Sequence, residues 1–156
     1  MHDADRRLIE WECAQNTVRF YNRLDGARGE AAAALFAEDG IWYQMNSDEG
    51  YRGRAEIAEH VNSVRQRGNP AIAEAERMVF HIVCNIEVTV IDADNAEVRA
   101  TTLVIPGSRG ASADTAGWTH GVSGVFPTIE MHRRTPEGWR IASKRTSLAM
   151  RVKPAA

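Results

Sequence analysis

The chain has 156 residues, of which 44% are hydrophobic and 26% charged, a composition typical of one globular domain with a sizeable core. Its 19 basic and 21 acidic side chains give a net charge of −2, which excludes a strong global attraction to nucleic acid or to an anionic membrane. The two isolated cysteines, Cys13 and Cys84, exclude a disulfide framework. Because the sequence shows neither a signal peptide nor a membrane-length apolar run, we expect a cytoplasmic protein with a single domain over residues 1–156.

The first half of the sequence predicts three helices. Apolar residues recur at three- and four-residue steps over 5–24, as in an amphipathic helix, and a glycine-containing break follows. An alanine-rich stretch over 30–37 predicts a second helix, and 55–67 predicts a third. A short strand over 41–45 and a turn over 46–50 are expected between them.

The second half predicts strands. Residues 78–90 are almost continuously apolar and rich in β-branched side chains, and further strands are expected over 96–105, 118–134 and 139–150. A loop is expected over 106–117. Helices followed by long antiparallel strands indicate an α+β fold. We predict a cone-shaped, curved, mostly antiparallel sheet with three N-terminal helices that enclose one pocket.

The first candidate for chemistry is His81, in the middle of the apolar strand. A polar ring there is costly to bury unless another group hydrogen-bonds it. Strand alternation places Asn85 on the same face as His81, so both are expected to border the same space. A histidine tied to a neighbour in the core is the simpler alternative.

Asp25 is the second candidate, because a carboxylate at the end of the first helix opposes the helix dipole and needs a partner. His81 would suit it: a carboxylate that orients an imidazole and stabilises its cation makes the ring a better base. A simple turn residue at the helix end is the alternative.

Other polar residues give weaker signals. Tyr43 and Tyr51 would each offer a phenol to a substrate oxygen, or would place a hydroxyl at the sheet rim. Arg145 would face inward as an anion clamp, or would lie on the solvated face. His132 is expected at a wet face or edge, and so is His120. We find no phosphate loop, zinc spacing or nucleophile elbow and expect no metal and no cofactor.

Four stretches of the sequence together resemble one protein family. They are Tyr21–Asp25 with Leu35–Tyr43, Tyr51–Ile57, His81–Asn85 and Glu137–Ile141. In order and spacing they resemble the SnoaL-like branch of the nuclear transport factor 2-like α+β cone proteins, over most of the chain.

The resemblance implies site residues. In enzymes similar to scytalone dehydratase and hexachlorocyclohexane dehydrochlorinase, an Asp after the first helix and a His in the long strand form an acid/base dyad, and these match Asp25 and His81. With one-residue gaps, the dehydratase tyrosine matches Tyr43 and the dehydrochlorinase arginine matches Arg145. Polar pocket positions of the dehydratase fall near Phe126, which implies a more apolar pocket here.

The resemblance leaves the activity open. It implies a cofactor-free lyase or isomerase that acts on a small cyclic hydrophobic substrate, with no nucleic-acid or membrane partner. The alternatives are a non-catalytic scaffold similar to the β subunit of ring-hydroxylating dioxygenases and a small-ligand-binding protein. Apolar residues on both faces of the long strands also predict a homodimer or homotrimer packed through the outer face of the sheet.

Overall fold

The computed structural model describes residues 1–26, 28–66, 77–108, 118–119 and 121–151. The described residues form three helices: α1 (Asp3–Gly26), α2 (Gly29–Ala33) and α3 (Gly53–Gln66). The strands are β1 (Phe36–Tyr43), β2 (Gly50–Arg52), β3 (Arg77–Val90), β4 (Asn95–Ser108), β5 (Trp118–Thr119), β6 (Gly124–Thr135), β7 (Gly138–Thr146) and β8 (Met150–Arg151). No helix within these ranges is long and apolar enough to cross a membrane.

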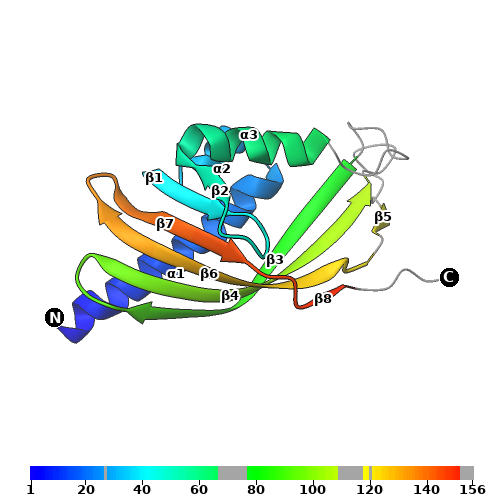
Figure 1. Cartoon of the computed structure of the whole chain (residues 1–156). Coiled ribbons are helices and arrows are strands. Elements are labelled where there is room, and N and C mark those ends of the chain that lie inside the picture. The colour runs from blue at the N-terminus through cyan, green and yellow to red at the C-terminus, as the bar shows by residue number, and fades with distance from the viewer. Residues whose placement is uncertain (27, 67–76, 109–117, 120, 152–156) are drawn as a thin grey trace.

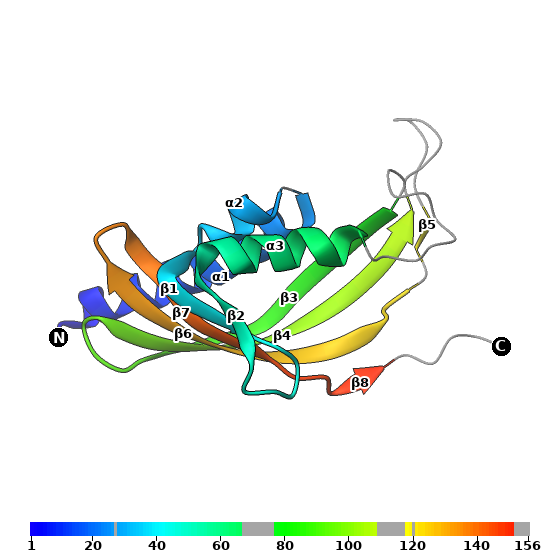
Figure 2. The same ribbon diagram turned by 45° about the horizontal axis from the view of Figure 1, so that its top comes forward.

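The strands form one curved, unclosed sheet in the order β2-β1-β7-β6-β4-β3, with β5 added to β4 and β8 added to β6 (Figure 1). The helices lie on its concave side (Figure 2). All strand pairs are antiparallel except β1 with β7, which is parallel. The predicted α+β fold with three helices over a curved sheet is therefore confirmed, and the sheet is mixed.

Several predicted elements have different limits; the first strand, predicted over 41–45, begins at Phe36 and ends at Tyr43. The second helix ends at Ala33 rather than at 37, because the chain enters β1 at Phe36 and the Ile141 N–H donates to the Leu35 carbonyl. Pairing with β7 thus overrides the helix preference of the alanine run. The predicted strand over 118–134 is divided into β5 and β6, and the one over 139–150 into β7 and β8. The first three residues of the predicted loop, 106–108, belong to β4 because they pair with β3, and the rest, 109–117, lies outside the described residues.

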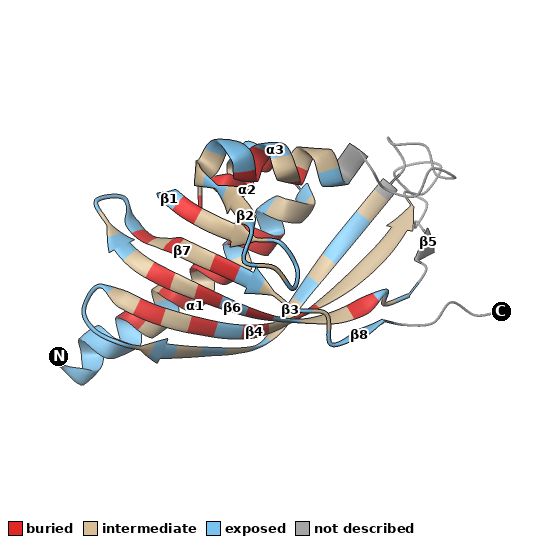
Figure 3. Cartoon of the chain, viewed as in Figure 1, coloured by how far each residue is buried: buried red, intermediate tan, exposed pale blue. Residues whose placement is uncertain are grey.

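Two buried clusters form the core between α1 and the sheet. One contains Phe20, Phe36, Ile57 and Ile141 and joins all three helices to β1 and β7. The other contains Ile9, Cys13, Ala96, Val98 and Trp139. In Figure 3 the buried residues of β4, β6 and β7 alternate with intermediate or exposed ones, as expected for period-two strands with one covered face.

Two β-bulges shift this alternation. In β3 the pairing with β4 changes register between Cys84 and Glu87, so one extra residue is accommodated there. In β7 the register with β6 shifts between Ser143 and Ile141. In both strands the residues that face the helices are odd-numbered before the bulge and even-numbered after it.

Candidate functional site

Asp25 and His81 are in direct contact. Asp25 lies in the last turn of α1 and His81 in β3, 56 positions later. The His81 ring Nδ1 lies 2.5 Å from Asp25 Oδ1, and the His81 backbone N–H donates to Asp25 Oδ2 at 2.7 Å. One carboxylate therefore holds both the main chain and the ring of the same residue, which fixes the ring's orientation.

The position of β3 in the sheet explains why this contact forms. β3 is the last strand of the sheet, so the N–H groups on its outer edge have no strand partner. The end of α1 covers this edge, and Asp25 accepts one of those N–H groups. Two donors from His81 also offset the unfavourable position of a carboxylate at a helix C-terminus.

The contact leaves one ring nitrogen available. Because the carboxylate accepts from Nδ1–H, the lone pair lies on Nε2 of the neutral ring. Nε2 makes no hydrogen bond with the part of the chain that the structure describes. The side chains of His81 and Asp25 are 18% and 14% exposed, so the pair is largely covered but not sealed from solvent.

A sealed polar network lies deeper on the same face. Lys144 Nζ donates to Glu130 Oε1 at 2.5 Å and to the Tyr21 hydroxyl at 2.9 Å. Glu130 also accepts from Thr17 Oγ1 at 2.7 Å and contacts His132 Nε2 at 2.9 Å. The Lys144 and Glu130 side chains are each 1% exposed, so every charge in the network is compensated by a neighbour rather than by water.

The charges of this network stabilise one another. Burial alone would raise the pKa of Glu130, but the charge of Lys144 and the hydrogen bond from His132 hold it well below its ordinary value. Burial alone would lower the pKa of Lys144, but the attraction of Glu130 and Tyr21 raises it. Both groups are therefore charged at neutral pH.

Tyr21 joins the sealed network to the dyad. It lies one helical turn before Asp25, so both side chains project from one face of α1. The Tyr21 ring packs at 5.7 Å from the His81 ring, and its hydroxyl accepts from Thr102 Oγ1 at 2.8 Å and from Lys144. The Tyr21 ring thus forms a wall beside His81.

Of the other predicted residues, Phe126 lies on the concave face near His81. His81 pairs with Val104, and Val104 pairs with Gly124. His81, Val104 and Gly124 thus form one cross-strand row. A Cβ on residue 124 would lie 2.8 Å from the Phe126 ring, so the glycine leaves space for that ring beside the row. Phe126, together with Val104 and Val83, provides an apolar surface next to the dyad.

Tyr51 also faces the helices but contacts a different group. Its ring stacks on His60 of α3 at 3.8 Å, and Trp42 packs edge-on against His60 at 5.3 Å. None of the contacts among the described residues joins Tyr51 to Asp25 or His81. Its environment is an aromatic cluster under α3.

The structure does not bring Tyr43 and Arg145 to the dyad. The Arg145 guanidinium lies 3.5 Å above the Tyr43 ring and binds Asp48 at 3.1 Å. Arg145 pairs with exposed Ile129, whereas Lys144 pairs with buried Glu130. The expectation that Arg145 faces inward is wrong, because the bulge in β7 turns Lys144 inward instead.

The expectation that Asn85 lies on the same face as His81 is also wrong, because β3 has a bulge as well. Asn85 has a φ of 51° and is exposed at the bulge of β3. Before the bulge the odd-numbered His81 faces the helices. After the bulge the even-numbered Ile86, Val88 and Val90 face the core. Asn85 and His81 therefore do not share a face.

His132 is buried rather than at a wet edge. Its side chain is 0% exposed, and its Nδ1 has no partner among the described residues. His120 lies outside the described residues. No group of three His, Cys, Asp or Glu side chains gathers to hold a metal ion within the described ranges.

The sequence reasoning missed the sealed network. A signal was present in α1, where Cys13, Thr17, Tyr21 and Asp25 recur every four residues and form one increasingly polar stripe. The strand residues that contact this stripe could not be predicted from the sequence, because the bulge in β7 decides which residues of that strand face the helices.

Described residues line at least two cavities. One, of about 200 Å³, lies at the β1–β2 loop and includes Asp48 and Arg145. The other, of about 480 Å³, lies beside α1 and the β6–β7 turn. Neither includes Asp25 or His81, so the predicted substrate pocket at the dyad stays a prediction.

Comparisons with known proteins agree with the observed fold. The family model of the SnoaL-like domain matches residues 5–145. A comparison with curated proteins gives no match. The structure is similar to a nuclear transport factor 2-like protein with a cystatin-like fold from Novosphingobium aromaticivorans, with 26% identity, a TM-score of 0.69, and coverage of 94% of this chain and 86% of that one.

Two further solved structures share the fold. A hexachlorocyclohexane dehydrochlorinase of type 2 has 12% identity and a TM-score of 0.72, with 99% of this chain and 94% of that one covered. ActVI-ORFA from Streptomyces coelicolor has 16% identity and a TM-score of 0.71, with 90% and 97% covered. The family match spans most of the chain, and the protein therefore belongs to the SnoaL-like domain family.

Proposed function

We propose that this protein is a cofactor-free lyase or isomerase, similar to dehydratases and dehydrohalogenases, that acts on a small cyclic hydrophobic substrate. The contact between Asp25 and His81 carries the proposal, because it supplies an oriented base with an available Nε2. The SnoaL-like family and the likeness to a dehydrochlorinase support the reaction class.

In the proposed step His81 Nε2 takes a proton from a substrate carbon next to a carbonyl or a leaving group. The electron pair of the broken C–H bond forms a carbon–carbon double bond. In a lyase the leaving group, water or halide, departs with its own bonding electrons. In an isomerase the proton returns to another carbon. Asp25 stabilises the imidazolium that forms in both cases.

The apolar surface beside the dyad supports a hydrophobic substrate. Phe126, Val83 and Val104 lie in or next to the cross-strand row of His81, and no cationic side chain of the described residues contacts the dyad. A substrate that buries a carbon ring there gains roughly 25 cal/mol for each Å² of apolar surface removed from water.

We propose further that the protein is a homodimer or homotrimer packed through the outer face of the sheet. Phe80 and Ile82 are 51% and 48% exposed there, and Ile82 is followed across β4, β6 and β8 by Leu103, Val125 and Met150. A soluble monomer rarely leaves such a continuous apolar row uncovered. Light scattering at micromolar concentration tests this, and a monomer would contradict it.

A substrate screen tests the proposed activity. Cyclic hydroxy-ketones, halogenated cyclohexanes and steroid-like ketones are incubated with the wild type, with His81→Ala and with Asp25→Asn. Each variant is expected to lose about 10²–10⁴-fold in turnover. The double variant should be little worse than either single one, because the two residues act as a unit.

Glu87→Gln, an exposed change in the same strand, is the matched control and should retain full turnover. If no compound is converted but one co-purifies with or binds the wild type, a ligand-binding protein replaces the enzyme. If neither occurs, the scaffold function gains support.

A further inference from the structure

The larger of the two cavities described above lies apart from the dyad and is lined by more arginines than glutamates. It is formed between α1, the α2–β1 connection, the start of α3 and the β6–β7 turn. Its charged lining residues are Glu12, Arg19, Arg23, Arg54, Glu137 and Arg140. Four arginines therefore face two glutamates, a local excess of two positive charges in a chain whose net charge is −2.

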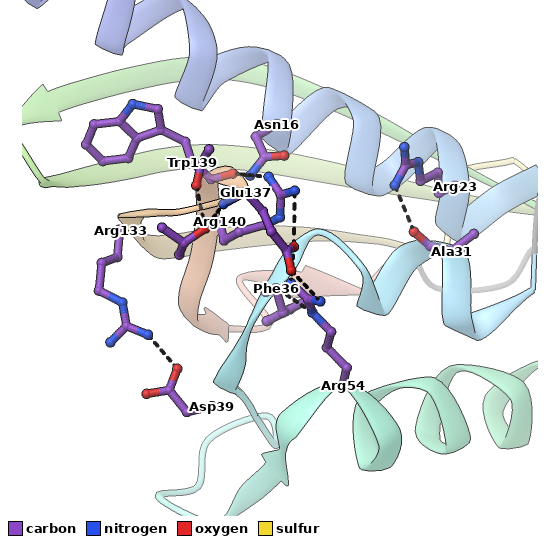
Figure 4. Close-up of polar contacts among 12 residues, drawn as sticks. Asn16, Arg23, Ala31, Phe36, Asp39, Arg54, Arg133, Glu137, Trp139 and Arg140 are labelled. Carbon is purple, nitrogen blue, oxygen red and sulfur yellow. Dashed lines mark hydrogen bonds and ion pairs between the residues drawn. The ribbon is translucent and has the colours of Figure 1, made fainter.

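An oxyanion already occupies one position in this arginine-lined cavity. Figure 4 shows the Glu137 carboxylate between the guanidinium groups of Arg54 and Arg140. Arg54 donates to Glu137 Oε2 at 2.8 Å, and Arg140 lies 3.4 Å from the same oxygen. Hydrogen bonding and the charge of Arg54 hold the pKa of Glu137 below its usual range. The site thus already holds a carboxylate oxygen between two guanidinium groups.

The cavity retains donors that Glu137 does not satisfy. Arg140 Nε is buried and has no partner among the described residues. Arg19 makes no ion pair or hydrogen bond with the described part of the chain, and Arg23 donates only to the Ala31 carbonyl, at 3.2 Å. Buried donors are normally hydrogen-bonded, so an acceptor is expected at Arg140 Nε, and the exposed Arg19 and Arg23 add charges that no carboxylate of the described residues pairs with.

A structural clip explains only part of this arrangement. Arg54, Glu137 and Arg140 tie the start of α3 to the β6–β7 turn, as a clip would. Such a clip has no use for Arg19 and Arg23, which project from α1 into the same cavity. The volume of about 480 Å³ is in the range of small-molecule sites.

We propose that this arginine-lined cavity binds a small anion that carries two or more carboxylate or phosphate groups. One oxyanion group takes the place of Glu137 between Arg54 and Arg140, and a second is held by Arg19 and Arg23. Guanidinium groups match both carboxylates and phosphates with two parallel hydrogen bonds, so the shared chemistry is the oxyanion. The site shares no residue with the dyad.

Isothermal titration calorimetry at constant ionic strength tests the proposal, with pyrophosphate and citrate as separate probes. The wild type is expected to bind one molar equivalent of at least one probe, and which of them binds tighter distinguishes a phosphate from a carboxylate ligand. Arg19→Gln/Arg23→Gln should weaken binding about tenfold, because charge-assisted hydrogen bonds are lost from exposed side chains that the fold does not need.

Two further variants make the test specific. Glu137→Gln should bind the anion tighter, because the competing carboxylate charge is removed. Arg99→Gln changes an arginine on the outer face, which pairs with Glu97, and should leave binding unchanged. No saturable binding of either probe, or equal weakening by Arg99→Gln, would overturn the proposal. A Glu137→Gln variant without tighter binding would overturn the placement of the anion between Arg54 and Arg140.

Discussion

Two carboxylates on the same concave face each contact a nitrogen-bearing side chain, and the two pairs differ in what surrounds them. Asp25 and His81 meet at 2.5 Å with 14% and 18% of their side chains exposed, whereas Glu130 and Lys144 meet at the same distance with 1% exposed. The contact distance therefore does not distinguish the two pairs. The difference lies in the atoms that remain without a partner.

In the sealed pair every charge is compensated. Glu130 accepts from Thr17 and from Lys144, and contacts His132, while Lys144 also donates to Tyr21. In the dyad, by contrast, Nε2 of His81 makes no hydrogen bond with the described residues. The sealed pair thus stabilises a wall of the site through Tyr21, and the open pair has a group available to a substrate.

The largest expected effect comes from breaking the sealed pair. Lys144→Met leaves Glu130 buried without its counter-charge and should lower the free energy of unfolding by about 3–5 kcal/mol. Urea denaturation followed by circular dichroism measures it. Arg145→Gln is the matched control one position along, on the outer face, and should change stability little. Equal losses in the two variants would contradict the comparison.

The second expected effect is a pH dependence that comes from the sealed pair. Glu130 has a folded-state pKa below the ordinary 4.5, so its contribution to stability is present above pH 4.5 and is lost as the pH falls toward the folded value. Lys144 has a pKa above the ordinary 10.5, so its contribution is present below that pH and is lost at higher pH.

Denaturation midpoints between pH 2 and 7 check this dependence. The wild type should lose stability steeply below pH 4.5, and Glu130→Gln should start lower and show a flatter acid limb. An unchanged acid limb in Glu130→Gln would show that other carboxylates dominate acid unfolding.

A smaller effect is expected from the open pair. Asp25→Asn retains the shape and one acceptor oxygen, so it should cost about 1 kcal/mol of stability while removing the proposed turnover. Urea denaturation and the substrate screen measure the two properties on one sample. A loss of stability as large as that of Lys144→Met would indicate that the dyad is a structural element of the core.

The smallest expected effect needs no substitution. Cys13 belongs to the increasingly polar stripe of α1 and is buried. Burial raises the pKa of its thiol to about 12. Cys84 is half-buried in β3. A thiol reagent at pH 8 should modify Cys84 within minutes and Cys13 only as fast as the protein opens. Mass spectrometry of timed samples reports both rates, and rapid modification of Cys13 would show that this region is not sealed.

The fold class and the two residues of the dyad could be predicted from the amino-acid sequence. Apolar steps of three and four residues predicted α1 and α3, and β-branched runs predicted β3 and β4, because both patterns depend on local periodicity. Asp25 and His81 were predictable because each was anomalous in its own element: a carboxylate against the helix dipole and a polar ring in an apolar strand. The family resemblance supplied the link between them.

The residues that surround the dyad could not be predicted in this way, because they depend on how the strands pair. Counting by twos from Ile141 leads to Arg145, and counting from His81 leads to Asn85, but a bulge in each strand reverses the count. A bulge adds one residue where two strands pair, so it depends on the partner strand and leaves no period in the sequence. For that reason Lys144 and not Arg145 faces inward, and the sealed network could be recognised only after the sheet had been assembled.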